Sequence, residues 1–217
     1  VENMIIPNSV IRIGARAFKN CTSLESVILS DKLAMISHEL FRGCISLTNC
    51  VIPHGISEIG SHAFDGCISL QEIVIPKNVK VVSGRAFMNC SKLRKLSFES
   101  GLQSIDYEAF QNCIGLTDVV LPNTVTNLCV AAFRSCSNLV SVALSSNLER
   151  IEGGAFQYCV SLKEMAIPSS VKFIGGTTFS RCRSLEKIVL PRNLDYIGSQ
   201  TFLMCSSLKE INIPDSV

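Results

Sequence analysis

A spacing of 23 residues governs this chain. A phenylalanine and, three residues after it, a cysteine return at that interval nine times without insertion or deletion. A fixed period of about 20 to 50 residues indicates a solenoid, in which each unit packs only on its neighbours. The phenylalanines are Phe18, Phe41, Phe64, Phe87, Phe110, Phe133, Phe156, Phe179 and Phe202. The cysteines are Cys21, Cys44, Cys67, Cys90, Cys113, Cys136, Cys159, Cys182 and Cys205.

The repeat also sets the domain organisation. Nine units of 23 account for 207 of the 217 residues, and ten residues remain for a partial tenth unit. We therefore predict a single solenoid over residues 1–217. Neither end of the sequence shows the atypical polar unit that caps a solenoid core. The sequence accordingly predicts a fragment of a longer chain.

Each unit has a regular order of apolar positions, numbered here from 1 to 23 starting at the first residue. Positions 4 and 6 are apolar and alternate with exposed neighbours, which predicts a short strand with one buried face. Proline at position 7 ends that strand in seven units. Further on, Ile59, Ala63, Phe64 and Cys67 have the spacing of one face of a short helix. We predict a strand, a turn, one or two helical turns and a return in each unit.

These residues carry a family resemblance. The order Leu-x-x-Ile-x-Ile-Pro-x-x-Val-x-x-Ile-Gly-x-x-Ala-Phe-x-x-Cys resembles the BspA-type leucine-rich repeat of bacterial and protist surface proteins. Residues 70–90 follow it closely, except that Val82 and Ser83 stand where Ile and Gly are usual. The resemblance implies an α/β repeat solenoid: a right-handed leucine-rich-repeat horseshoe with a parallel β-sheet on its concave face and short helical turns on its convex face.

The exposed positions of the predicted sheet are the candidate protein-binding face. Position 5 forms a largely apolar stripe, which either marks an interaction site or merely satisfies the strand propensity of β-branched residues. Position 3 carries charges of nearly alternating sign, which can hold the register of the stack and keep it soluble. The candidate residues at position 5 are Val74, Ser97, Val120, Ala143, Ala166 and Val189. Those at position 3 are Glu72, Lys95, Asp118, Ser141, Glu164 and Lys187.

One unit departs from the pattern on this face. Arg94 and Lys95 form a local basic spot there. Ser97 interrupts the apolar stripe, and Glu99 replaces the proline. This unit is either a ligand contact or the result of neutral drift.

Composition and motifs argue against several classes of function. A net charge of +2 disfavours nucleic-acid binding, and no apolar run has the length of a membrane span. The histidines His38, His54 and His62 fall at three different repeat positions without a repeated partner, so we expect solvated surface roles for them. The sequence holds no Cys-x-x-Cys pair for a metal and no glycine-rich phosphate loop. We expect no enzyme activity, cofactor or metal.

The cysteines leave two alternatives. Equivalent cysteines of stacked units lie close enough for a disulfide ladder, but their number is odd and their side chains point the same way. We favour a ladder of buried free thiols that act as small hydrophobic side chains.

Taken together, these features predict a non-enzymatic module that binds a protein through its concave sheet. The family resemblance implies a cell-surface or secreted protein that adheres to host, matrix or other cell proteins, although residues 1–4 show no signal peptide. The alternatives are an intracellular scaffold and a structural spacer of a larger protein.

Overall fold

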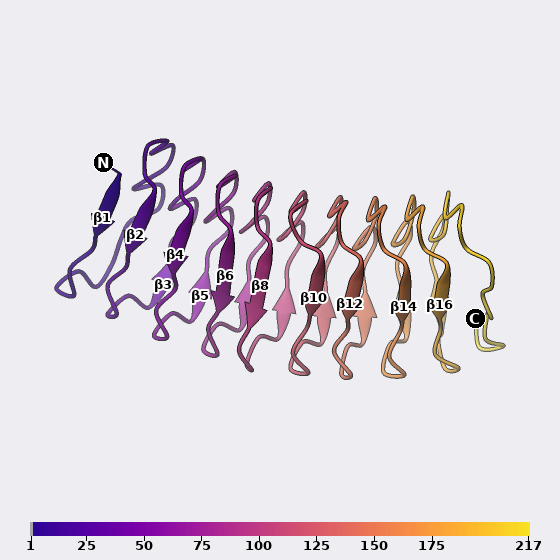
Figure 1. The fold of residues 1–217 in the computed structure, drawn as a ribbon. Helices are drawn as coiled ribbons and strands as arrows, with labels where there is room; N and C mark the ends of the chain where they lie inside the picture. Colours follow the sequence, from indigo (N-terminus) through magenta and orange to yellow (C-terminus); the bar gives the residue numbers. More distant parts are fainter. Residues whose placement is uncertain (1) are drawn as a thin grey trace.

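A computed structural model describes residues 2–217 of the chain. Figure 1 shows a single row of stacked turns, each built from a front strand, a lower loop, a shorter rear strand and an upper loop. In this view the row bends only gently along its length. The front strands are β1 (Asn3–Ile5), β2 (Ser26–Ile28), β4 (Asn49–Val51), β6 (Glu72–Ile75), β8 (Lys95–Phe98), β10 (Asp118–Val120), β12 (Ser141–Ala143), β14 (Glu164–Ala166) and β16 (Lys187–Val189).

The strand pairing is parallel throughout, and its register follows the sequence repeat. Met4 pairs with Val27, and Val27 pairs with Cys50, so each step of the ladder is one 23-residue unit. The front strands are hydrogen-bonded in the groups β1-β2-β4, β6-β8, β10-β12 and β14-β16. This arrangement confirms a parallel-strand solenoid of the leucine-rich-repeat type. We call the front strands together the front sheet.

A second sheet runs behind the first and was missed by the sequence analysis. It pairs eight two-residue strands in order along the row. In each unit position 12 lies at the surface or partly so, and position 13 points into the core, as in Glu58 and Ile59. These rear strands are β3 (Met35–Ile36), β5 (Glu58–Ile59), β7 (Val81–Val82), β9 (Ser104–Ile105), β11 (Asn127–Leu128), β13 (Arg150–Ile151), β15 (Phe173–Ile174) and β17 (Tyr196–Ile197).

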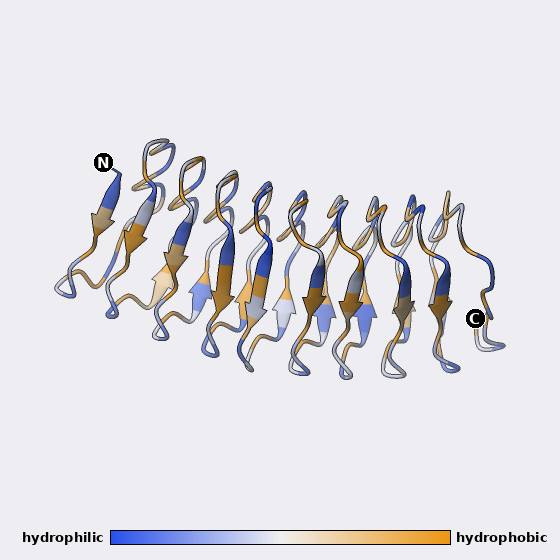
Figure 2. Ribbon diagram, in the orientation of Figure 1, coloured by the Kyte–Doolittle hydropathy of each residue, from blue (hydrophilic) through white to orange (hydrophobic). Residues whose placement is uncertain are grey.

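The core lies between the two sheets. In β6 the side chains alternate, with Glu72 and Val74 exposed and Ile73 and Ile75 buried. In Figure 2 most front strands begin hydrophilic and become hydrophobic toward their ends, because position 3 is mostly polar and positions 4 to 6 are largely apolar. Burial, in contrast, alternates from one residue to the next. Such an alternation is the period of a strand with one buried face. The front-strand pattern therefore forms as the sequence predicts.

The phenylalanines stack as a continuous ladder below the upper loops. Successive rings from Phe18 to Phe202 are stacked, with centroids 5.1–5.9 Å apart. The seven rings from Phe41 to Phe179 are fully buried, whereas the two end rings are half-buried. A buried aromatic side chain removes a large apolar surface from water, so this ladder is a principal source of stability.

The predicted helical turns are wrong: residues 2–217 contain no helix. The positions expected to be helical instead have two left-handed residues in every unit, at positions 16 and 20, with φ between 52° and 76°. A helical residue needs φ near −63°, so these residues break any helix. In the third unit, Phe64 N–H donates to Ala86 O of the next unit at 2.7 Å, and Cys67 N–H closes a tight turn on Phe64 O at 3.0 Å. The segment is a chain of tight turns bonded between units.

Candidate interaction surface

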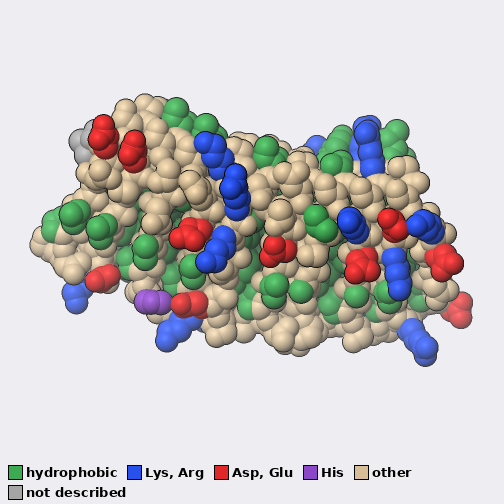
Figure 3. Space-filling model, in the orientation of Figure 1, with side chains coloured by type: hydrophobic (Ala, Val, Ile, Leu, Met, Phe, Trp, Pro, Cys, Tyr) green, Lys and Arg blue, Asp and Glu red, His purple; other side chains and the backbone are tan. Residues whose placement is uncertain are grey.

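The outer face of the front sheet brings the candidate residues together. All thirteen (Arg94 included) are exposed except Ser97, which is half-buried. The aliphatic side chains of the position 5 stripe are open to solvent, with Val51 70% and Val120 66% exposed. Figure 3 views this face and shows hydrophobic side chains along it, with acidic and basic side chains alternating above them toward the C-terminal end. The stripe is therefore a solvent-facing apolar line bordered by charges.

The charges on this face form few close pairs. Lys95 Nζ lies 3.8 Å from Glu72 Oε2, and Lys209 Nζ lies 2.8 Å from Glu186 Oε2. The Lys209 hydrogen bond lowers the pKa of the Glu186 carboxyl, and the same bond raises the pKa of Lys209. All four side chains are more than half exposed, so these pairs contribute little to stability.

Two neighbouring hollows indent the front sheet where it crosses β4, β6 and β8. The lower one measures about 330 Å³ and has an apolar floor that includes Val51, Ile73 and Val74. The upper one measures about 460 Å³ and is lined by the polar side chains of positions 2 and 3 of the same three units. Asn49, Glu72 and Lys95 belong to both hollows. The indentation therefore combines an apolar floor with a charged border.

A third hollow of about 380 Å³ lies farther along the same sheet. It is lined by residues of β12, β14 and β16, among them Ala166, Lys187 and Val189. The front sheet is thus indented at two places along its length.

The densest charge cluster lies elsewhere and was not predicted. It sits in the upper loops of the first three units, at positions 14–23, which we call the turn edge. The Glu39 carboxylate is only 6% exposed, and Arg16 Nη2, Lys19 Nζ and Arg42 Nη1 lie 3.0, 2.5 and 3.3 Å from its oxygens. Hydrogen bonds from Arg16 and then Lys19 hold the pKa of Glu39 well below its ordinary value. The Glu39 carboxylate therefore finds its ionic and hydrogen-bonding partners within the fold.

The cluster continues along the turn edge as a hydrogen-bonded chain. Arg42 Nε lies 3.1 Å from Asp65 Oδ2, so its guanidinium bridges Glu39 and Asp65. Asn89 Nδ2 donates to Asp65 Oδ1 at 3.1 Å, and Asn112 Nδ2 donates to Asn89 Oδ1 at 2.9 Å. Five successive units are linked in this way.

The expectation of solvated histidines is wrong for His62, whose side chain is 16% exposed with Nδ1 3.0 Å from Asp65 Oδ2. His38 Nε2 lies 2.7 Å from Glu39 Oε1, and its ring meets the His62 ring edge to face at 6.1 Å. His54 Nδ1 lies 3.5 Å from a Glu99 oxygen on a more exposed rim. Asp65 and Glu39 belong to the same units as the histidines they contact, at other repeat positions, whereas Glu99 comes from a different unit than His54.

The cysteine ladder is made of free thiols, buried from Cys44 to Cys182, with Cys21 exposed and Cys205 half-buried. The thiols also have a polar role that the sequence analysis did not predict. From Cys44 onward, each donates to the phenylalanine carbonyl of the preceding unit, as Cys113 Sγ does to Phe87 O at 3.2 Å. Burial raises the pKa of Cys44 to about 11 and of Cys136 to about 12, so both remain protonated donors.

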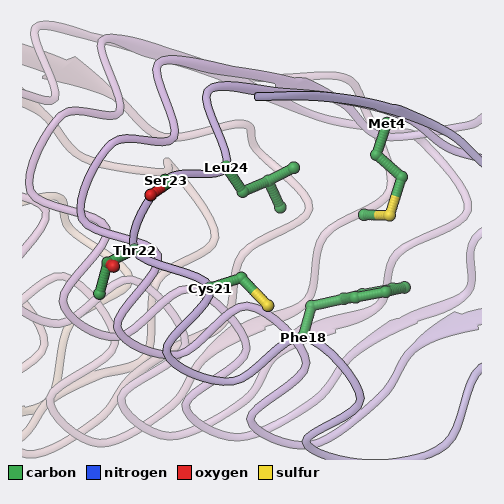
Figure 4. Close-up of a pocket in the computed structure, with 6 residues that line it drawn as sticks. All are labelled: Met4, Phe18, Cys21, Thr22, Ser23 and Leu24. Atoms are coloured by element: carbon green, nitrogen blue, oxygen red, sulfur yellow. The ribbon is translucent and has the colours of Figure 1, made fainter. Parts of the chain in front are cut away.

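A further hollow of about 320 Å³ opens at the N-terminal end of the stack (Figure 4). Met4, Phe18, Cys21 and Leu24 line it together with two small polar side chains. The equivalents of Phe18 and Cys21 in the next unit, Phe41 and Cys44, are fully buried. The hollow is therefore an open end of the core and carries no charged group.

Residues 2–217 hold neither a metal-ligand cluster nor a helix able to cross a membrane. No group of three or more histidine, cysteine or acidic side chains there is arranged to hold a metal ion. That part of the chain also has no helix with the length and hydropathy that crossing a bilayer requires.

The parallel front sheet, the stacked core and the 23-residue register together define a leucine-rich-repeat solenoid. The sequence matches the profile described as "BspA type Leucine rich repeat region" over residues 1–117 and 103–217. The chain belongs to this family, as its motif predicts. A search of curated protein sequences returns no match.

Solved structures of bacterial leucine-rich-repeat proteins are similar to this chain. One from Bacteroides ovatus is 26% identical, with a TM-score of 0.74 over 99% of this chain and 67% of that one. One from T. pallidum is 27% identical, with a TM-score of 0.61 over 92% and 86% of the two chains. A leucine rich cell surface protein from Faecalibacterium prausnitzii is 23% identical, with a TM-score of 0.52 over 95% and 77%, a likeness of fold alone.

Proposed function

We propose that this solenoid is a non-enzymatic protein-recognition module that binds its partner on the front sheet. One observation carries the proposal, namely the largely apolar stripe of position 5, which stays open to solvent beside two indentations of the sheet. An exposed apolar patch rimmed by polar residues is a common mark of a protein interaction site. The residues assigned to this role are the thirteen candidates of the front sheet.

The setting that fits the family resemblance is the cell surface or the exterior, with adhesion to host, matrix or other cell proteins as the role. This setting rests on the BspA-type repeat, and no residue of the chain carries it independently. An intracellular scaffold using the same sheet is the second candidate. The eleven free cysteines support it, because thiols persist unpaired in reducing compartments. A structural spacer is the third.

The binding surface is tested by a double substitution, Val74→Asp with Val120→Asp. We expect this variant to fold and to lose adhesion to the matrix proteins or cells that the parent protein binds, because two charges then interrupt the stripe. The matched control is Ile68→Asp with Ile114→Asp, which changes two comparably exposed aliphatic residues on the turn edge. Equal adhesion by the front-sheet variant and the parent contradicts the proposal.

Protease treatment of intact source cells distinguishes the cell-surface setting from the intracellular scaffold. Release of the module from unlysed cells supports the surface role. Retention until lysis, with cleavage afterwards, supports the scaffold.

A further inference from the structure

We infer that the paired hollows of β4, β6 and β8 receive an extended peptide segment of the partner, in which an acidic residue stands two positions from an aliphatic one. The inference rests on the proposed function and specifies the chemistry of the partner. The upper hollow takes the carboxylate, and the lower hollow takes the aliphatic side chain.

The lower hollow suits an aliphatic side chain because its floor is apolar and open. Val51 and Val74 lie there with 70% and 48% of their surface exposed. In the pairing of β6 with β8, the neighbour of Val74 is Ser97, whose side chain is smaller than those of the valines of this stripe. Covering such a floor removes apolar surface from water, which favours binding.

The acidic group at the lower rim is already engaged within the protein. A Glu99 carboxylate oxygen accepts a hydrogen bond from Lys77 N–H at 2.9 Å and lies 3.5 Å from His54 Nδ1. Glu99 therefore adds no unpartnered carboxylate to the lower hollow, whose other charged residues, Glu72 and Lys95, lie 3.8 Å apart.

The upper hollow has an uncompensated positive charge. Two cations, Arg94 and Lys95, line it with one carboxylate, Glu72, which lies 3.8 Å from Lys95. Within residues 2–217, the Arg94 guanidinium makes no ion pair. An exposed guanidinium in this position can bind a carboxylate by two parallel hydrogen bonds.

Arg94 differs in this respect from the other cations of the front sheet. At its own repeat position the neighbouring units carry the uncharged Gln71 and Thr117. Each of the other cations has a carboxylate at its own position in an adjacent unit. Those cations are Lys95, Lys163, Lys187 and Lys209. Among the cations at positions 2 and 3, Arg94 is therefore the one without a carboxylate at its own position in an adjacent unit, and a partner's carboxylate would supply it.

The distance between the two hollows along the strands determines the form of the ligand. Glu72, the register partner of Lys95 in the upper hollow, and Val74, on the floor of the lower hollow, are two residues apart in β6, which is about 6.6 Å along a strand. Side chains two residues apart in an extended peptide have the same separation and the same direction. A peptide lying along the strands can therefore place an acid at Arg94 and Lys95 while its aliphatic neighbour covers Val74.

The test is selection of a library of short random peptides on the immobilised protein. The enriched peptides should carry aspartate or glutamate two positions from valine, leucine or isoleucine. Their affinity, measured by fluorescence anisotropy, should fall about tenfold or more in Arg94→Gln, which removes a charged hydrogen-bonding partner. It should also weaken as salt is added. The matched control Arg183→Gln, an exposed arginine on the turn edge, should bind like the parent.

Other outcomes overturn the inference. It fails if no peptide is enriched, if the enriched peptides lack an acid, or if Arg94→Gln binds them as tightly as the parent does. If Val74→Asp abolishes binding but Arg94→Gln does not weaken it, the requirement for an acidic residue in the peptide is wrong. The front sheet then stays the proposed binding surface. When neither Val74→Asp nor Arg94→Gln changes the affinity, this inference and the proposed function fail together.

Discussion

The front sheet and the turn edge both carry many charged residues, but they use them differently. On the turn edge, the side chains of Glu39 and Asp65 are 6% and 8% exposed, and each has several partners from neighbouring units. On the front sheet, Glu72 and Lys95 are 57% and 72% exposed and form one long contact. Charges that are buried with partners hold units together, whereas exposed charges stay available to another molecule.

The contrast extends to the apolar residues of the two regions. The phenylalanine and cysteine side chains of the turn edge form ladders that are buried and bonded from unit to unit. The front sheet buries its positions 4 and 6 but leaves position 5 in solvent. Stability should therefore depend mainly on the turn edge and the core, and binding mainly on the front sheet.

The largest expected effect comes from Phe110→Ala, which removes a buried ring at position 18 of the turn edge. Phe110 is fully buried between Phe87 and Phe133, with ring centroids 5.3 Å away on each side. Removing the ring leaves a cavity, so the free energy of unfolding should drop by about 3–5 kcal/mol in chemical denaturation. Phe173→Ala, which removes a half-exposed ring of the rear sheet, should cost clearly less. Equal losses for the two variants would contradict the assignment of the ladder to the core.

The next largest effect concerns Glu39. Because its pKa is lowered in the folded state, the carboxylate adds stability above its ordinary pKa of 4.5 and loses that contribution as the pH falls below it. Glu39→Gln should lower the free energy of unfolding by about 1–3 kcal/mol at neutral pH. Its thermal stability should also fall less steeply with acid than that of the parent. Parallel pH profiles for the two proteins would show that Glu39 is not stabilised by its partners.

A smaller effect, distinguished by its sign, tests the tight turns against the helix predicted from the sequence. Gly66 has a φ of +76°, and Gly66→Ala should cost about 1 kcal/mol because alanine is strained in the left-handed region. In a helix the same change would stabilise the protein. Gly14→Ala is the control, since a Cβ there meets no atom within 4 Å and its φ is not left-handed. If Gly66→Ala stabilised the protein, the tight turn would be wrong and the helix predicted from the sequence would be right.

The smallest expected effect is on the front sheet. Glu72→Gln removes the exposed pair with Lys95 and should change the free energy of unfolding by less than about 0.5 kcal/mol. Chemical denaturation beside Glu39→Gln provides the comparison. A loss as large as that of Glu39→Gln would remove the distinction between the two regions.

Much of the fold can be predicted from the sequence because residues that pack in the core return at the same repeat positions. The front strands, their parallel order and the Phe110 and Cys113 ladders all follow from positions that return every 23 residues. The exposed stripe could be predicted for the same reason, since residues such as Val120 alternate with buried ones. Its role in binding stays a proposal.

The features missed by the sequence analysis depend on contacts between units. The left-handed residues of the turn edge include Arg85 and Glu108, types that carry no turn signal by themselves, and their backbone bonds go to the next unit. The rear strands are two residues long, too short for a periodic pattern. The Glu39 cluster combines Lys19 and Arg42, which share position 19 in adjacent units, with a carboxylate at position 16. A comparison of the charged residues at positions 15–20 across the units could have predicted this cluster.

The most direct test of the account measures both stability and peptide affinity in Arg94→Gln and Glu39→Gln. Arg94→Gln should unfold like the parent protein and bind the selected peptides about tenfold more weakly or worse. Glu39→Gln should unfold more easily and bind those peptides with unchanged affinity at a temperature where it is folded. If Arg94→Gln destabilises the protein, or Glu39→Gln weakens binding while folded, the division between a front sheet for recognition and a turn edge for stability is wrong.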